Sequence, residues 1–110
     1  MNGRAGRSKI HAAAALAAVG WYLLTPPTAR VNDEWIVHTE SPLSEWDQHA
    51  RFNAATACEK ELSLYRKQTI EQARALTGEP KQVEKARMFF YVLSNTANCI
   101  ASDDPRLKEK

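Results

Sequence analysis

Residues 53–80 decide the fold class, and they read NAATACEKELSLYRKQTIEQARALTGEP. Small and apolar side chains recur here every three or four residues, which places them on one face of a helix. The residues of that face are Ala55, Cys58, Leu62, Tyr65, Thr69, Ala73 and Leu76. Asn53 suits the N-cap, because its side chain accepts hydrogen bonds from free N–H groups, and Gly78 suits the position after the C-terminus. The pattern predicts a helix from Ala54 to Leu76.

A second helix is predicted from Lys81 to Ser94, after the break that Pro80 makes in the first. Its apolar positions again recur at helical spacing. The residues of this face are Val83, Ala86, Phe90 and Leu93, and Met88, Phe89 and Tyr91 widen it. The two predicted helices would therefore each offer one apolar face to a common core.

Two short strands are expected to flank the helices. From Trp46 to Phe52 apolar and polar residues alternate, a period of two that is typical of a half-buried strand. The core-facing set would be Trp46, Gln48, Ala50 and Phe52. Cys99 to Ala101 would form a closing strand. The order strand, helix, helix, strand predicts a small α+β domain over residues 43–105, and an all-α helical hairpin is the alternative.

The N-terminal part has the order of basic and apolar residues found in export signals. The first nine residues are polar and basic, and an apolar run of 15 residues follows from Ile10 to Leu24. As a helix, this run would span about 22 Å, short of the roughly 30 Å of a bilayer core, but Trp21 and Tyr22 suit a membrane interface. We expect a signal-anchor helix over residues 1–25 that contacts the membrane through residues 10–25.

Other interpretations of this segment stay open. A cleaved signal peptide needs small residues at the first and third positions before the cut, and a cut after Ala29 puts Pro27 at the third. A mitochondrial presequence agrees with the absence of acidic residues before Asp33, although presequences are amphipathic rather than continuously apolar. A buried N-terminal helix is the remaining alternative. An anchored or a secreted chain would carry its domain outside the cytoplasm, in the periplasm or cell envelope.

Cys58 and Cys99 are the only cysteines, and both follow the export-like segment. Oxidising compartments let such a pair persist as a disulfide, and the helical pattern turns Cys58 towards the core. A redox site would show C-x-x-C spacing, and a zinc site would have to add His38 and His49 without any closely spaced ligand pair. We therefore expect a structural disulfide, and no motif for a metal or another cofactor is present.

Charge is segregated along the chain. All ionised groups before Asp33 are basic, whereas 11 basic and 13 acidic residues follow from Val31 onward. A nucleic-acid-binding protein needs a concentrated basic face to displace counterions from phosphates. The mixed charge of the folded part argues against nucleic acid as a partner. Residues 26–42 read as a linker, in which Trp35, Ile36 and Val37 could form a short strand or a docking patch, and residues 106–110 read as a charged tail.

Four segments of the chain form a pattern of their own. They are GWYLLTPP at 20–27, PLSEW at 42–46, FNAATACE at 52–59 and CIASDDPRLK at 99–108. Together they resemble a family of small, uncharacterised bacterial exported or membrane-anchored proteins. The resemblance implies a bacterial source and paired cysteines, and it implies no activity and no catalytic residue.

Two sets of residues are candidates for function. Glu45, Asp47 and His49 would share one face of the first strand, where two carboxylates and an imidazole could bind a metal or do acid–base chemistry, although a solvated outer face explains them as well. The second set is Phe89, Phe90 and Tyr91, which are consecutive. A helix separates neighbours by about 100°, so one of the three rings should face outward and contact a partner.

These observations favour a non-enzymatic, membrane-tethered module of the cell envelope that contacts another protein or has a structural role. The alternative is a small metal-binding accessory or enzyme that uses the first candidate set. No catalytic motif such as Gly-x-Ser-x-Gly or a glycine-rich phosphate loop is present in the sequence.

Overall fold

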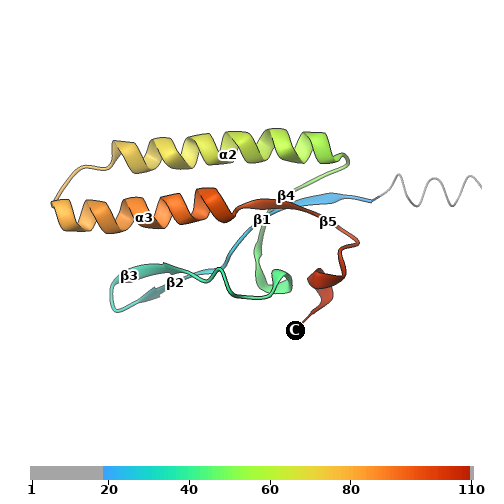
Figure 1. The fold of residues 1–110 in the computed structure, drawn as a ribbon, viewed down its shortest axis with the longest axis horizontal. Helices are drawn as coiled ribbons and strands as arrows, with labels where there is room; N and C mark the ends of the chain where they lie inside the picture. The colour runs from blue at the N-terminus through green and yellow to red at the C-terminus, as the bar shows by residue number, and fades with distance from the viewer. Residues whose placement is uncertain (1–18, 110) are drawn as a thin grey trace, which may run out of the picture.

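The computed structural model describes residues 19–109 and has an α+β fold (Figure 1). The elements in chain order are β1 (Trp21–Thr25), β2 (Thr28–Val31), β3 (Glu34–Val37), the 3-10 helix η1 (Leu43–Glu45), β4 (Asp47–Phe52), α2 (Ala55–Ala75), α3 (Pro80–Thr96), β5 (Asn98–Ala101) and the 3-10 helix η2 (Pro105–Lys108). The predicted order strand, helix, helix, strand is confirmed for β4, α2, α3 and β5. The all-α alternative is wrong, because strands pair on both sides of β1.

Strand β1 is the centre of a three-stranded antiparallel sheet with the order β4-β1-β5. Leu23 pairs with Ala50 on one side and with Cys99 on the other. The pairing extends beyond the strand, because the amide of Gly20 donates to Ser102 Oγ (2.9 Å) and the amide of Ser102 donates to the carbonyl of Gly20 (2.8 Å). The ordered hydrogen bonding of the sheet therefore begins at Gly20.

The prediction of one apolar helix that reaches Leu24 is wrong for its last part. Residues 21–24 belong to β1, and Leu23 and Leu24 are buried at 2% and 3% exposure. Trp21 and Tyr22 favour a strand, as aromatic residues do. Pairing with β4 and β5 then supplies the backbone hydrogen bonds of this segment. The rest of the predicted signal anchor lies outside the described residues. Within residues 19–109, no helix combines the length and apolar character needed to cross a membrane.

The strand β4 departs from simple alternation at a β-bulge. Leu23 pairs with Ala50 and Leu24 with Gln48, so His49 has no residue opposite it. A bulge lets two neighbouring side chains lean to the same side of a sheet. The imidazole of His49 contacts the ring of Tyr65 on α2, but His49 and Gln48 are both exposed. The expectation that Gln48 faces the core was therefore wrong.

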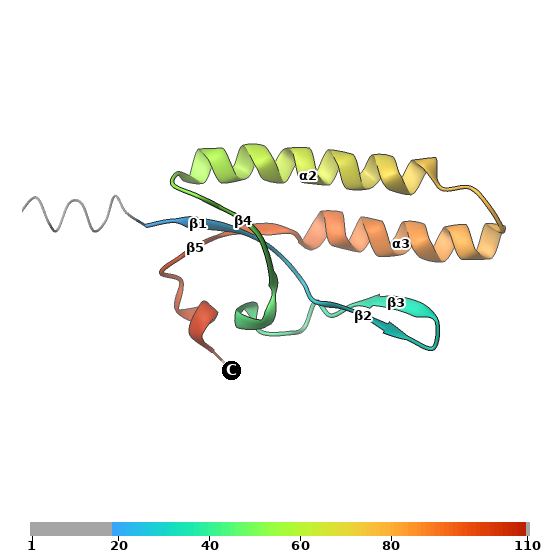
Figure 2. The same cartoon turned by 180° about the vertical axis from the view of Figure 1, so that it is seen from behind.

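Helices α2 and α3 form an antiparallel hairpin, in which the first part of α2 lies over the sheet and α3 runs into β5 at the end of the sheet (Figures 1 and 2). The core cluster between α2 and the sheet consists of Leu23, Cys58, Leu62 and Ala97, with Trp21, Phe52, Tyr65 and Cys99 packed against it. The predicted apolar face of α2 is therefore confirmed. The predicted cap is wrong, because Ala54 is the N-cap and no side chain bonds to the first turn. Gly78 has φ of +133°, which a side chain would disfavour.

Two arginines join the helices, because each donates hydrogen bonds to the last turn of the opposite helix. Arg66 of α2 donates to the carbonyls of Ser94 and Ala97 at the end of α3, both at 3.0 Å. Arg87 of α3 donates to the carbonyl of Ala73 at the end of α2, at 2.9 Å. The last carbonyls of a helix have no intrahelical partner and lie at the negative end of its dipole. A guanidinium there stabilises both the helix end and the hairpin.

Replacement of Arg66 by methionine should lower the free energy of unfolding by about 2 kcal/mol, because two charge-assisted hydrogen bonds to part-buried carbonyls are lost. Urea unfolding followed by circular dichroism measures this change. Lys67→Met is the matched control, since Lys67 is exposed and makes no hydrogen bond or ion pair among residues 19–109, and it should stay within about 0.5 kcal/mol. Equal effects of the two substitutions would contradict the capping role.

The segment expected to be a linker contains a hairpin of β2 and β3. Asn32 and Asp33 connect the strands with φ of 51° and 66°, which fits the two-residue turns that match strand twist. The hairpin closes where the amide of His38 donates to the carbonyl of Pro27 at 2.8 Å. It lies alongside α3, and β3 makes the contacts. The linker prediction over residues 26–42 therefore misses an ordered element.

The 3-10 helices η1 and η2 lie together on the side of the sheet away from α2 and α3 (Figures 1 and 2). The hydroxyl of Ser44 in η1 donates to the carbonyl of Glu109, just after η2. Trp46 follows η1, and its indole N–H donates to the carbonyl of Ser41 at 2.8 Å. These hydrogen bonds tie the segment after η2 to the segment that leads into β4.

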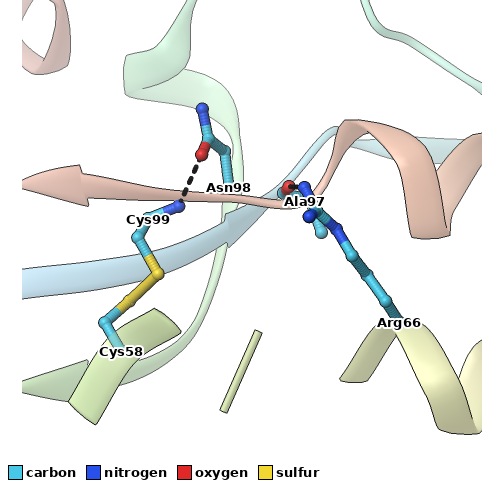
Figure 3. The surroundings of a disulfide bond; sticks show 5 residues. All are labelled: Cys58, Arg66, Ala97, Asn98 and Cys99. Atoms are coloured by element: carbon cyan, nitrogen blue, oxygen red, sulfur yellow. Dashed lines mark hydrogen bonds between the residues drawn. A yellow bond between two sulfur atoms is a disulfide. The ribbon is translucent and has the colours of Figure 1, made fainter. Parts of the chain in front are cut away.

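The predicted disulfide is confirmed. Cys58, in the first turn of α2, is bonded to Cys99 on β5, with 6.1 Å between the two Cα atoms (Figure 3). Cys58 is fully buried in the core cluster. The bond closes a loop of 41 residues that contains both helices, so it ties the start of the helical hairpin to the strand that follows its end.

Loss of this bond should destabilise the domain by about 4 kcal/mol, the chain-entropy value for a loop of this length. A Cys58→Ala/Cys99→Ala variant, unfolded in urea beside the oxidised protein, measures the difference. That amount is a large share of the 5–15 kcal/mol that holds a typical domain together. The wild-type protein, once its disulfide has been reduced, should unfold at the same urea concentration as the variant. A midpoint unaffected by both treatments would contradict a stabilising disulfide.

Candidate functional site

A concavity lies between the β2–β3 hairpin and α3, and we call it the hairpin–α3 groove. Its volume is about 710 Å³, within the range of sites that take small ligands or peptide side chains. Its lining residues are Thr28, Asp33, Glu34, Trp35, Ile36, Val37, Gln82, Lys85, Ala86, Met88, Phe89, Phe90 and Val92. The groove is mostly apolar, and its charged side chains are Asp33 and Glu34 of the hairpin and Lys85 of α3.

Large apolar side chains line the groove and remain open to solvent. Trp35 is 56% exposed, Met88 61% and Ile36 39%. The ring of Trp35 meets that of Phe89 at a centroid distance of 6.2 Å, and Phe89 meets Phe90 edge to face at 5.5 Å. These contacts fix the rings in orientation without burying them. Exposed apolar surface that is held rigid costs little conformational entropy when a partner covers it.

The charged end of the groove is balanced. Lys85 Nζ lies 2.6 Å from Glu34 Oε1, and Arg30 lies 3.5 Å from Asp33. The hydrogen bond with Glu34 raises the pKa of Lys85, so the ammonium is kept charged. All four side chains are largely exposed, so the pairs add little to stability. Each pair joins one cation and one anion, so the charges at this end of the groove are balanced.

The predicted aromatic set divides between two concavities. Phe89 and Phe90 line the hairpin–α3 groove. Tyr91, 36% exposed, instead lines a second concavity of about 540 Å³ beside the turn between the helices. Met88 lines both, so the two hollows meet on the outer surface of α3. The role of the three rings in partner binding stays a prediction.

The predicted set Glu45, Asp47 and His49 is not brought together on one strand face. Glu45 lies in η1, Asp47 begins β4 and His49 lies at the bulge. Among residues 19–109, no three histidine, cysteine or acidic side chains are grouped so that they could hold a metal ion. The expectation of a shared face was therefore wrong, because Glu45 lies in η1 before the strand and the bulge at His49 interrupts the alternation.

His49 instead makes contacts that tie β4 to β1 and α2. Its Nε2 lies 2.7 Å from Thr25 Oγ1, and its ring lies 5.3 Å from that of Tyr65. Burial raises the pKa of Tyr65. A hydroxyl beside an imidazole resembles an activated nucleophile, but Thr25 is only 3% exposed and lines neither concavity. His49 is exposed, but the buried hydroxyl of Thr25 cannot reach a substrate, so the pair is a contact between β4 and β1.

The two rings that we expected at a membrane interface have contacts within the domain. Trp21 packs against the core cluster. The guanidinium of Arg51 lies over the ring of Tyr22, with 5.8 Å from Cζ to the centroid, a cation–π distance. Both residues pair in β1, opposite Phe52 and Arg51 of β4.

The strand expected at Trp35, Ile36 and Val37 is confirmed as part of β3, and its role as a docking patch stays a prediction. The pairing of this strand with β2 was not predicted. Its signal was present, because Asn32-Asp33 precedes the strand and Asn and Asp favour the turns of two-residue hairpins. The contact of Trp35 with Phe89 joins residues 54 positions apart, which no local pattern predicts.

The chain has no counterpart in any of the three comparisons with known proteins. No family model, no curated protein and no solved structure matches it.

Proposed function

We propose that this protein is an exported, non-enzymatic interaction module that holds an apolar segment of another envelope protein in the hairpin–α3 groove. The observation that carries the proposal is the groove itself, whose exposed walls are formed by Trp35, Ile36 and Met88. Exposed apolar patches of this kind mark sites where proteins or ligands bind. The described residues offer no metal cluster and no accessible nucleophile–base pair that would favour an enzyme.

A segment of a different protein fits this groove better than a second copy of the chain. An isologous dimer sets the same surface against itself, which here would put one hollow against another. A copy would need a separate apolar protrusion to fill the groove. Among residues 19–109, Leu64 is the one exposed large hydrophobic residue on α2, and the others lie on the hairpin or α3. The balanced charges at the rim favour a neutral, apolar guest.

The site of action outside the cytoplasm is supported by two features. The Cys58–Cys99 bond needs an oxidising compartment to persist. The N-terminal sequence is basic and then apolar, as in export signals. The resemblance to small bacterial exported proteins agrees with this placement and suggests the periplasm or cell envelope.

Photo-crosslinking tests the proposed contact. A benzophenone amino acid placed at position 88, on the protein in its native bacterium, should crosslink to one apolar segment of another envelope protein. The same amino acid at position 64 is the matched control, because Leu64 is also exposed, at 43%, but lies on α2 away from the groove. The crosslinked segment, identified by mass spectrometry and synthesised, should bind the purified protein.

Affinity for that peptide provides the quantitative result. Met88→Lys should weaken binding at least about tenfold, equivalent to 1.4 kcal/mol, because a charge would enter the apolar groove. Leu64→Lys should leave binding unchanged. Crosslinks only to a second copy of the chain, or equal crosslinking from positions 64 and 88, would overturn the proposal.

A further inference from the structure

The start of the fold restricts where the chain can be cut. Residues 21–25 are the central strand of the sheet, with Leu23 and Leu24 buried. Gly20 is fastened as well, since its N–H and C=O groups both bond to Ser102. An added Cβ at Gly20 would lie 2.6 Å from Nε of Arg51, so this glycine is enclosed by its neighbours. The segment from Gly20 to Thr25 is therefore needed to complete the sheet.

A cut after Ala29, the position that the sequence suggested, is therefore incompatible with this fold. It would remove all of β1 and the first half of β2. Strands β4 and β5 are not neighbours and pair only through β1. Their backbone groups would lose their partners, and the core would lose Leu23. Such a fragment could not keep the described structure.

The apolar run that precedes the fold has the dimensions of a cleavable signal. Once Gly20 is assigned to the domain, the run shortens from 15 residues to the ten from Ile10 to Val19. A signal peptide has an apolar region of about 7–15 residues that follows a basic region and ends in a small-x-small site. A helix of ten residues would reach about 15 Å, half of the roughly 30 Å hydrocarbon core. The shortened run thus favours removal over permanent anchoring.

We propose that a signal peptidase hydrolyses the peptide bond between Ala17 and Ala18. Ala15 and Ala17 supply the small third and first positions, with Leu16 between them. Water adds across the bond, which leaves a carboxylate on Ala17 and a new amino group on Ala18. A cut one residue later puts Leu16 at the third position, and a cut after Gly20 removes its two bonds to Ser102. The assigned bond leaves three residues before β1.

This inference rests on the export that the proposed function requires, and the test separates the two. The full chain is produced in a bacterium, and the protein is recovered from the envelope and from the cytoplasm. Intact mass and N-terminal sequencing, with thiol alkylation before and after reduction, are measured on each fraction. The expected product begins at Ala18 and has both thiols blocked until reduction. The matched variants are Ala17→Phe, which puts a bulky residue at the cut, and Ala13→Phe, which puts the same ring inside the apolar run.

Ala17→Phe should reduce the Ala18-initiated product at least tenfold, and Ala13→Phe should not. An exported, disulfide-bonded protein that starts at any other residue, or that retains Met1, would overturn the cut while leaving the proposed function intact. Cytoplasmic protein with two free thiols would overturn export and with it the proposed function. An equal loss of processing in the two variants would also contradict the assigned bond.

Discussion

The pairing of β1 on both of its edges is the interaction on which the rest of the structure depends. Leu23 holds β4 through Ala50 and β5 through Cys99, and its side chain joins the core that α2 covers. Because β4 leads into α2 and β5 follows α3, this one strand gathers both ends of the helical hairpin. The disulfide between Cys58 and Cys99 then fixes covalently what the strand has aligned (Figure 3).

The groove is a consequence of the same arrangement. The chain leaves β1 through two prolines, which cannot continue a regular sheet edge, and turns back as the β2–β3 hairpin beside α3. Arg66 and Arg87 join α2 and α3, because each donates hydrogen bonds to carbonyls at the C-terminal end of the other helix. The hairpin–α3 groove lies between α3 and the β2–β3 hairpin. The rings of Trp35, Phe89 and Phe90 line it, and none of them belongs to the core cluster.

Local sequence pattern was sufficient to predict the two helices and insufficient to predict β1. The periodicity around Cys58 and Leu62 predicts the buried face of α2, because helical contacts are set by residues close in sequence. Residues 21–24 resemble a continuation of the apolar run, and only pairing with strands about 28 and 77 positions away makes them a strand. The same limit applies to the site: Phe89 was recognised, but its partner Trp35 and the bulge at His49 depend on contacts that no local spacing encodes.

The most direct test of this account is the NMR measurement of residues 19–25 in the oxidised full-length chain. The account predicts β-type carbon chemical shifts from Trp21 to Thr25, cross-strand contacts of Leu23 with Ala50 and Cys99, and amides of Leu23 and Leu24 among the slowest to exchange with solvent. Helical chemical shifts across these residues, with rapid exchange and no contact to β5, would contradict it.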